Sequence, residues 1–299
     1  MEERNKDKHS KKAKQQIVQA EQQFADCLEK LAEEIAQRRE LRLLRLVGPT
    51  CSGKTTAAEL LGECLARRGK RLHTISIDDF YYDKELLHAR AKGKVDYDSV
   101  KTIDLPALRR FLEELRTKES SHCPIFDFKE GKRIGYRTMA CGADDLFLFE
   151  GIQVLYPEVT ALFEAAGYPS EAIYIAPLTP VRTDGVTVEP NELRLLRRLV
   201  RDHKKRNTPP EQTFSLWEGV RSNEEDNIFP YVDACTYRIS SSMSYELGIL
   251  APHLRRILSQ IAADSPYAAQ AHDILQKIEG IEPLSDTLLP EHSLYREFV

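Results

Sequence analysis

The stretch LRLLRLVGPTCSGKTTAA, residues 41–58, decides the fold of this chain. An apolar run leads into the spacing G-x4-G-K-T, formed by Gly48, Gly53, Lys54 and Thr55. This order predicts a strand, a phosphate-binding loop and a helix, because consecutive backbone N–H groups of such a loop can surround an anion. The Lys54 ammonium would lie beside the β- and γ-phosphates of a nucleotide, the Thr55 hydroxyl would face Mg²⁺, and the helix N-terminus would add its positive dipole end. An ordinary glycine-rich turn would leave Lys54 and Thr55 unexplained.

The composition describes a chain that can bury a sizeable core. It has 299 residues, of which 41% are hydrophobic, enough for one large domain or two modest ones. The formal net charge of −4 gives no overall signature of nucleic-acid binding. No apolar run approaches the length of a membrane span, and the first residues, MEERNKDKHSKKAK, lack the apolar core of a signal peptide. We therefore expect a cytoplasmic protein without membrane attachment.

The cysteines indicate reduced thiols. All six are free of C-x-x-C pairs and of Cys/His metal spacing, so we expect neither disulfides nor structural zinc. Cys51 lies inside the phosphate loop, and a thiol beside a helix N-terminus and Lys54 can have a lowered pKa. This gives the hypothesis that oxidation or alkylation of Cys51 blocks nucleotide binding. The alternative is a small residue tolerated at a variable loop position.

Segments typical of strands alternate with helical ones along the chain, and this predicts a parallel, doubly wound α/β sheet. After the first strand, the predicted strands are residues 71–77, 145–149, 172–176 and 236–240, and the clearest helices are residues 54–68 and 104–118. Carboxylates follow two of these strands, as Asp78-Asp79 and as Glu150. Ligands collect at the carboxyl ends of strands in parallel sheets, so these side chains would face the phosphate loop. The structural alternative for the Asp pair is a capped turn.

The remaining segments follow the same periodicity rules. They predict a mobile basic segment at residues 1–15, an amphipathic helix at residues 17–39 and an irregular segment at residues 84–103. They also predict a β-hairpin at residues 121–137 and two amphipathic helices at residues 244–258 and 266–278.

An arginine-rich helix is predicted between the last two strands, over residues 190–206. Its leucines would face inward, and its arginines would form an arginine-dense outer side made of Arg194, Arg197, Arg198, Arg201 and Arg206. Such runs are most often solvated faces. Forked guanidinium groups suit phosphate oxygens, however, and a phosphate loop is present in the same chain.

Several motifs together resemble one family. GPTCSGKT, DDFYYD, VDYDSVKTIDLPAL, PIFDFKEGKR, FEGI and RLLRRLVRDHKKRN occur in the order and approximate spacing of the uridine kinase and phosphoribulokinase family of P-loop kinases. The blocks WEGVRSNEEDNIFPY and SYELGILAP look most like a bacterial uridine kinase-like subgroup. The resemblance implies a P-loop NTPase fold with a β-hairpin and an Arg-rich helical lid. The chain would divide into a basic tail with an amphipathic helix, a kinase domain and a C-terminal helical extension, over residues 1–39, 40–260 and 261–299.

The resemblance also implies roles for single residues. ATP or GTP would be bound by Gly48, Cys51, Ser52, Gly53, Lys54, Thr55, Thr56 and Arg198, and Mg²⁺ by Thr55 and Glu150. The catalytic groups would be Asp78, as the base facing the acceptor hydroxyl, with Lys54, Arg201 and Arg206. The acceptor would contact Asp79, Tyr81, Asp98, Phe126 and Arg194. Because Asp79 occupies a position usually taken by a small polar residue, a swap of roles between Asp78 and Asp79 is conceivable.

Two positions depart from the family pattern. Pyrimidine-nucleoside kinases have a Tyr and a His on the hairpin, where this chain has Phe126 and Gly131. Phe126 can stack on a base but offers no hydroxyl, and Gly131 offers no side-chain hydrogen bond. Sites that read a polar edge gain much of their discrimination from such bonds, so the departures bear on base specificity.

The expected activity is transfer of the γ-phosphoryl of ATP or GTP to the 5′-hydroxyl of a nucleoside, most simply uridine or cytidine. One alternative is a kinase of the same superfamily that acts on a sugar phosphate or pantothenate. A second is a nucleotide-binding regulator or nucleic-acid-associated ATPase, supported by the basic N-terminal run and by residues 197–206. The expected partner is a small acceptor rather than a nucleic acid, and self-association is left open.

Overall fold

The computed structural model describes residues 2–91, 95, 97, 99–167 and 169–299. Its centre is a five-stranded sheet with the order β2-β5-β1-β6-β9, in which every neighbouring pair is parallel. The strands are β1 (Leu43–Val47), β2 (Arg71–Ser76), β5 (Asp145–Glu150), β6 (Ser170–Ala176) and β9 (Tyr237–Ser240). The expected parallel α/β fold is confirmed. The carboxyl ends of β2 and β5, which carry the acidic motifs, lie at the same end of the sheet.

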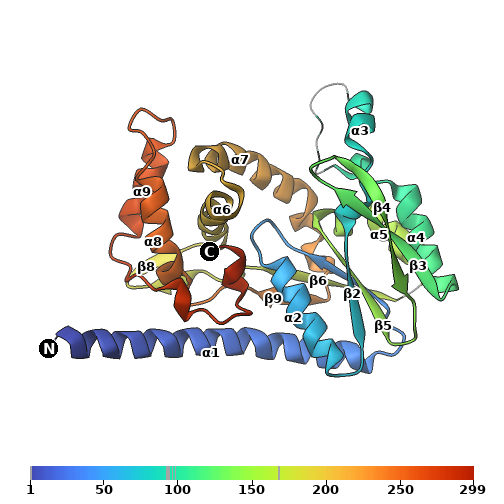
Figure 1. Ribbon diagram of the computed structural model, residues 1–299, viewed down its shortest axis with the longest axis horizontal. Coiled ribbons are helices and arrows are strands. Elements are labelled where there is room, and N and C mark those ends of the chain that lie inside the picture. Colours follow the sequence, from blue (N-terminus) through green and yellow to red (C-terminus); the bar gives the residue numbers. More distant parts are fainter. Residues whose placement is uncertain (1, 92–94, 96, 98, 168) are drawn as a thin grey trace.

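Helices cover both faces of this sheet, as Figure 1 shows. The helices of the structure are α1 (Glu2–Gln37), α2 (Lys54–Ala66), α3 (Lys84–Arg90), α4 (Leu105–Thr117), α5 (Pro157–Ala165), α6 (Pro190–Arg206), α7 (Pro210–Asn227), α8 (Glu246–Leu258) and α9 (Ala268–Lys277), of which α3 and α9 lie away from the sheet. Alternate residues of a strand point to opposite faces, so Leu44 and Leu46 join a core with α1, α2, α6 and α8. Leu43 and Val47 join a second core with α4 and α5.

The N-terminal helix is longer than expected. Ile17, Phe24, Leu28, Leu31 and Ile35 are buried against the body of the protein, which confirms the amphipathic helix. Residues 2–15, expected to be a mobile basic segment, belong to the same helix, because α1 is continuous from Glu2. No Pro or Gly interrupts this part of the sequence. Ala13, one helical turn before Ile17, is also buried, so the buried face of the helix extends by one turn. Of the helices that the structure describes, none is both long and apolar enough to cross a membrane.

The predicted hairpin is confirmed as β3 (Ser120–Asp127) and β4 (Lys132–Ala140), which pair antiparallel. The expected irregular segment is partly wrong, because it contains α3, whose Leu87 is buried. Helix α5 and the short hairpin formed by β7 (Val181–Thr183) and β8 (Val186–Val188) were not predicted from the sequence. These are short elements whose apolar positions are too few to show a period.

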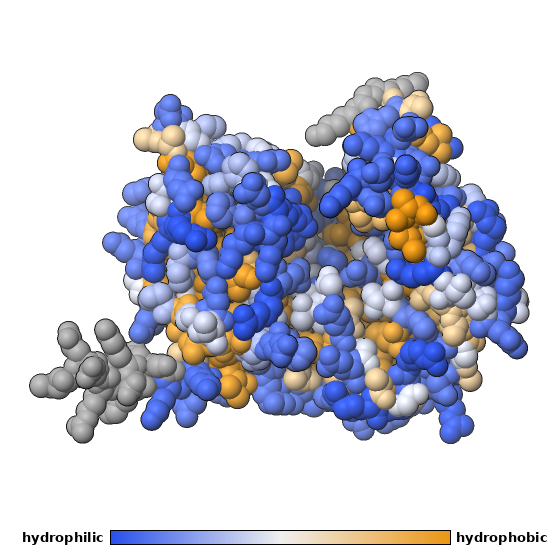
Figure 2. All heavy atoms as spheres, in the orientation of Figure 1, coloured by the Kyte–Doolittle hydropathy of each residue, from blue (hydrophilic) through white to orange (hydrophobic). Residues whose placement is uncertain are grey.

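Residues beyond α9 return to the sheet. They include a 3-10 helix at Leu294–Glu297, and Leu294, Tyr295 and Phe298 are fully buried in the same core as α2 and α6. In Figure 2 the surface is hollowed between the side of the molecule that carries α6 and α7 and the side that carries α3 and the β3–β4 hairpin.

Candidate active site

The phosphate loop lies between β1 and α2. Gly53 has a φ of +88°, a left-handed conformation that favours glycine, and a Cβ added at Gly48 would lie 2.1 Å from the Ile175 carbonyl oxygen. Both glycines are therefore required by the backbone path. Lys54 Nζ donates to the carbonyl oxygens of Gly48 (2.8 Å) and Pro49 (3.2 Å), so the ammonium group lies across the loop. The loop and the N-terminus of α2 thus present N–H groups and one cation to the same space.

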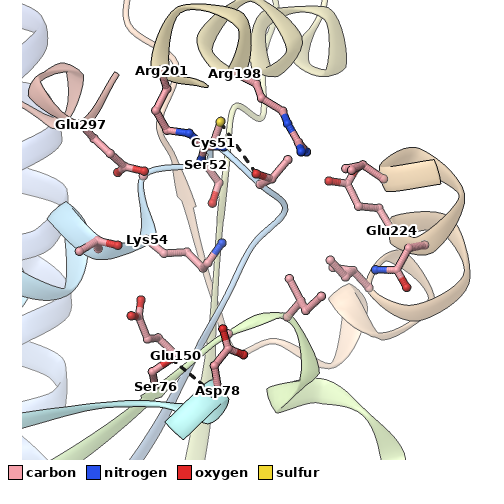
Figure 3. A pocket seen from close by; sticks show the side chains of 18 of the residues that line it. Cys51, Ser52, Lys54, Ser76, Asp78, Glu150, Arg198, Arg201, Glu224 and Glu297 are labelled. Atoms are coloured by element: carbon pink, nitrogen blue, oxygen red, sulfur yellow. Dashed lines mark hydrogen bonds between the residues drawn. The ribbon is translucent and has the colours of Figure 1, made fainter. Parts of the chain in front are cut away.

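That space is a cavity of about 560 Å³. Most of the predicted site residues line it: Cys51, Ser52, Gly53, Lys54, Thr55, Asp78, Tyr81, Glu150, Arg198, Arg201 and Arg206. Figure 3 shows Arg198 and Arg201 on one side of Lys54, and Asp78 and Glu150 on the other. The predicted residues Gly48, Thr56, Asp79, Phe126 and Arg194 are not among its lining residues.

Asp78 stands at the carboxyl end of β2, in a 3-10 helix whose first turn is held by the Asp78 backbone N–H donating to Ser76 Oγ at 3.4 Å. Burial raises the pKa of its carboxyl group, while the nearby Tyr81 hydroxyl and the charge of Lys54 act in the opposite direction. Burial also raises the pKa of Glu150 and lowers that of Lys54. These three groups, brought from the ends of two strands and from α2, surround the place where a hydroxyl and a phosphoryl group could meet.

Asp79 faces away from the cavity. Its Oδ1 accepts from the Phe126 backbone N–H and its Oδ2 from the Arg137 guanidinium, both at 3.2 Å. Asp79 therefore holds the β3–β4 hairpin against the sheet. This geometry favours Asp78 over Asp79 as the base, although both carboxylates follow the same strand.

Aromatic and amide groups surround Tyr81, which lines the cavity and is expected to contact the acceptor. The Tyr81 hydroxyl donates to the Tyr97 carbonyl oxygen (3.1 Å) and accepts from Gln153 Nε2 (2.8 Å), and the Tyr81 ring meets Phe126 edge-on at 5.9 Å. Gln153 is buried and was missed by the sequence reasoning, because a lone Gln after a strand carries no motif. Asp98, expected at the acceptor, lies outside the described residues.

Gly131 occupies a turn that requires glycine. Its φ is +66°, and an added Cβ would lie 2.8 Å from the Lys84 side chain. The Gly131 backbone N–H donates to the Asp127 carbonyl oxygen, and its own carbonyl accepts from the Lys84 N–H, both at 2.7 Å. The backbone path of the hairpin thus requires glycine at position 131, so no side chain there can contact a nucleobase.

The arginines of α6 do not form one outer side. Arg194 and Arg197 are 1% and 0% exposed, so that expectation is wrong for both. Arg194 donates to both carboxylate oxygens of Glu224 at 2.6 Å, and Arg197 to those of Glu246 at 2.9 and 3.1 Å. The periodicity rule assigned charged residues to solvent, but buried carboxylates from α7 and α8 pair with them instead.

Three other arginines of α6 gather around one carboxylate that the sequence reasoning missed, that of Asp202. Arg201 donates to Asp202 Oδ1 at 2.7 Å, Arg198 donates to Oδ2 at 3.2 Å, and Arg206 lies 3.6 Å from Oδ1. Asp202 is buried, and the three arginines line the cavity. Asp202 thus holds the guanidinium groups at the cavity wall.

We expect Asp202→Asn to weaken nucleotide binding about three- to tenfold, because three long side chains would lose a shared anchor and would have to be ordered by the ligand. Calorimetric titration with ATP and Mg²⁺ measures this. Asp226→Asn, at an exposed carboxylate on α7, is the matched control and should bind like the wild type. Unchanged affinity in Asp202→Asn would show that the arginines are ordered without it.

Cys51 is buried, with 3% of its surface exposed, and burial raises the pKa of its thiol. The hypothesis of a lowered pKa is therefore wrong, because loss of water around the thiolate outweighs the nearby cations. We expect a thiol reagent to modify the exposed Cys27 in the folded protein and Cys51 only after unfolding, as peptide mass mapping would show. Modification of Cys51 as fast as Cys27 would contradict this.

A magnesium ion fits the donor set of the cavity. The Thr55 hydroxyl and the carboxylates of Asp78 and Glu150 all line it. Mg²⁺ prefers oxygen ligands and usually keeps several waters, so one or two protein ligands with the phosphates suffice. Within the described ranges, no group of three or more His, Cys, Asp or Glu side chains could hold a metal by itself. The arrangement therefore suits an ion that arrives with a nucleotide.

One residue of the cavity comes from the far end of the sequence. Glu297, in the last 3-10 helix, lines the cavity beside the phosphate loop. Nothing in the local sequence distinguishes it from other surface glutamates, and only the tertiary packing of its neighbours brings it to the site.

Known proteins resemble this chain over more than half of its length. The model of the "Phosphoribulokinase / Uridine kinase family" matches residues 43–241. The uridine kinase of Ureaplasma parvum serovar 3 is 24% identical over 189 residues, which cover 62% of this chain and 81% of that protein. The uridine kinase of Clostridium novyi is 28% identical over 179 residues, covering 60% and 76%. A solved structure titled as a possible uridine kinase from Bacillus stearothermophilus covers 72% of this chain and 98% of its own, with a TM-score of 0.48 and 16% identity.

Proposed function

Since the chain belongs to the phosphoribulokinase/uridine kinase family of P-loop kinases, we propose that it transfers the γ-phosphoryl group of ATP or GTP to the 5′-hydroxyl of a nucleoside, with uridine or cytidine as the first candidates. The observation that carries the proposal is the placement of the Asp78 carboxylate, the Lys54 ammonium and the guanidinium groups of α6 around one cavity. We further propose that the enzyme is cytoplasmic and serves pyrimidine salvage.

The chemistry requires positioning and charge neutralisation more than base strength, because phosphoryl transfer passes through a loose transition state. The loop amides and Lys54 would hold the β- and γ-phosphates, and Arg201 and Arg206 would neutralise charge on the transferring group. Bound Mg²⁺ would supply further charge neutralisation, held by Thr55 and Glu150. Asp78 would orient the acceptor hydroxyl and accept its proton late in the transfer.

The lid helices would exclude water as a competing acceptor. Residues of α6 and α7, including Arg198, Arg206 and Asn223, line one wall of the cavity. Closure of such a wall over the phosphates sequesters the reaction from water, which favours transfer to the bound hydroxyl over hydrolysis.

We expect a bell-shaped dependence of kcat/KM on pH. The rate should rise as Asp78 loses its proton, and burial moves this limb to higher pH than an ordinary Asp would give. The rate should fall as Lys54 loses its charge, and burial moves that limb to lower pH than an ordinary Lys would give. Steady-state rates across pH at fixed ionic strength measure both limbs. An acid limb at the pKa of a free Asp would contradict the assigned environment of Asp78.

The experiment that tests the proposed function is NDP release from ATP and Mg²⁺ with a panel of acceptors. The panel holds uridine, cytidine, purine nucleosides, pantothenate and ribulose 5-phosphate. Asp78→Asn is assayed alongside, and its control is Asp144→Asn, at an exposed carboxylate in the turn before β5 that does not line the cavity. Turnover with uridine or cytidine supports the proposal, and turnover only with pantothenate or the sugar phosphate identifies a different kinase. Nucleotide binding without turnover on any acceptor would favour the alternative of a nucleotide-binding regulator.

A further inference from the structure

The last residues of the sequence are fixed against the phosphate loop. A Cβ added at Gly53 would lie 2.3 Å from Leu294 Cδ1, so the Leu294 side chain packs on the glycine that starts α2. Arg197 donates to the Cys51 carbonyl oxygen at 3.1 Å and to the Tyr295 hydroxyl, and its guanidinium lies over the rings of Tyr295 and Phe298. Residues 293–299 are therefore held in place by the same arginine that supports the loop.

This packing delivers the carboxylate of Glu297 to the cavity. Glu297 Oε2 is buried and has no hydrogen-bond partner among the described residues. Burial raises the pKa of the carboxyl group, and the charges of Lys54 and Arg201 oppose this shift without forming an ion pair with it. A buried carboxylate oxygen without a donor is costly, so its retention beside a ligand cavity points to a donor that arrives with the ligand.

The chemistry of a nucleotide restricts which part can supply that donor. At neutral pH the phosphate oxygens of ATP act as acceptors, and they would be repelled by a carboxylate. The sugar hydroxyls and the base amino group are donors. Figure 3 shows Glu297 well apart from Asp78 and Glu150, with Lys54 between them in the view. Carboxylates thus lie on both sides of Lys54, with Arg201 beside Glu297, which suits phosphates at the cations and a donor-bearing group at each carboxylate.

We propose that Glu297 accepts a hydrogen bond from the nucleoside part of the phosphoryl-donor nucleotide, from a sugar hydroxyl or from the base amino group. This contact places the nucleoside beside α2 and directs the phosphates past Lys54 toward Asp78. The inference rests on the proposed function, because it requires a nucleotide in this cavity. It adds a specificity-determining residue outside the segment that the family model matches, which ends at residue 241.

The test compares Glu297→Gln with Glu291→Gln, an exposed glutamate in the same segment. Calorimetry with Mg²⁺ measures the dissociation constants of ATP and of inorganic tripolyphosphate. In Glu297→Gln we expect ATP binding to weaken about three- to tenfold, because a charge-assisted hydrogen bond becomes a neutral one. Tripolyphosphate binding should not weaken, since it lacks the nucleoside and removal of a negative charge favours an anion. Glu291→Gln should match the wild type for both ligands.

Nucleotide analogues identify which donor group is bound. The wild type is titrated with the 2′-deoxy and 3′-deoxy analogues of ATP and with purine riboside triphosphate, which lacks the 6-amino group. The analogue that lacks the contacting group should bind wild type and Glu297→Gln equally. If Glu297→Gln binds ATP as tightly as the wild type or more tightly, or weakens tripolyphosphate binding as well, the inference is overturned. If the wild type binds neither ATP nor tripolyphosphate, the proposed function itself fails.

Discussion

Replacing Asp78 by Asn is expected to lower kcat about 10²–10⁴-fold while the dissociation constant of ATP stays within about twofold, because Asn keeps the shape of the side chain but cannot accept a proton. Asp78 lies at the carboxyl end of β2 and lines the cavity, whereas Asp79 is held by the hairpin through Phe126 and Arg137. The loss should therefore appear in the chemical step and not in nucleotide binding. Single-turnover kinetics with saturating acceptor measures that step directly.

Asp79→Asn gives the contrasting result that identifies the base. The Asp79 carboxylate accepts a hydrogen bond from Arg137 of the hairpin, so we expect weaker acceptor binding and lower stability. The single-turnover rate at saturating acceptor should fall less than in Asp78→Asn. A rate loss larger in Asp79→Asn than in Asp78→Asn would reverse the assignment of the two carboxylates.

Replacing Arg197 by Met is expected to cost about 3–5 kcal/mol of unfolding free energy, because it leaves the Glu246 carboxylate buried without its partner. Arg197 and Glu246 are each 0% exposed, and Arg197 also bonds Ser241, the Cys51 carbonyl oxygen and Tyr295. For a chain of this size the expected fall in Tm is roughly 5–15 °C. Thermal unfolding followed by circular dichroism measures it.

Two further variants separate the buried charge from simple loss of packing. Arg256→Met removes an exposed arginine of α8 and should leave Tm within about 2 °C of the wild type. The double variant Arg197→Met/Glu246→Leu removes both charges and should recover part of the loss, since replacing a buried ion pair by apolar residues is often close to neutral. A double variant less stable than Arg197→Met alone would contradict this explanation.

The parts of the site that could be predicted from the sequence are those encoded locally. The phosphate loop is a single short motif, and Asp78 and Glu150 directly follow apolar runs that form β2 and β5. A parallel sheet brings the ends of its strands to one edge, so one general rule placed both carboxylates beside Lys54. The resemblance to a known family then assigned roles to positions that the rule had already brought together.

The parts that could not be predicted depend on partners far away in the sequence. Arg194 and Arg197 follow the polar pattern of a helix, and only the carboxylates of Glu224 and Glu246, 30 and 49 residues further on, make their burial favourable. Glu297 reaches the cavity because Leu294 packs on Gly53, a contact that no local period reveals. The N-terminal part of α1, before Ile17, was missed for the opposite reason, since a charged segment can be helical without any apolar period.

The most direct test of phosphoryl transfer to a nucleoside 5′-hydroxyl uses γ-labelled ATP and Mg²⁺ with uridine and, in parallel, with 5′-deoxyuridine. We expect label in uridine 5′-monophosphate in the first reaction and no labelled nucleoside in the second. When Asp78 is replaced by Asn, labelling of uridine should be about 10²–10⁴-fold slower. Label released only as inorganic phosphate, at a rate that is the same with either nucleoside and in the Asp78 variant, would contradict a nucleoside kinase built on this cavity.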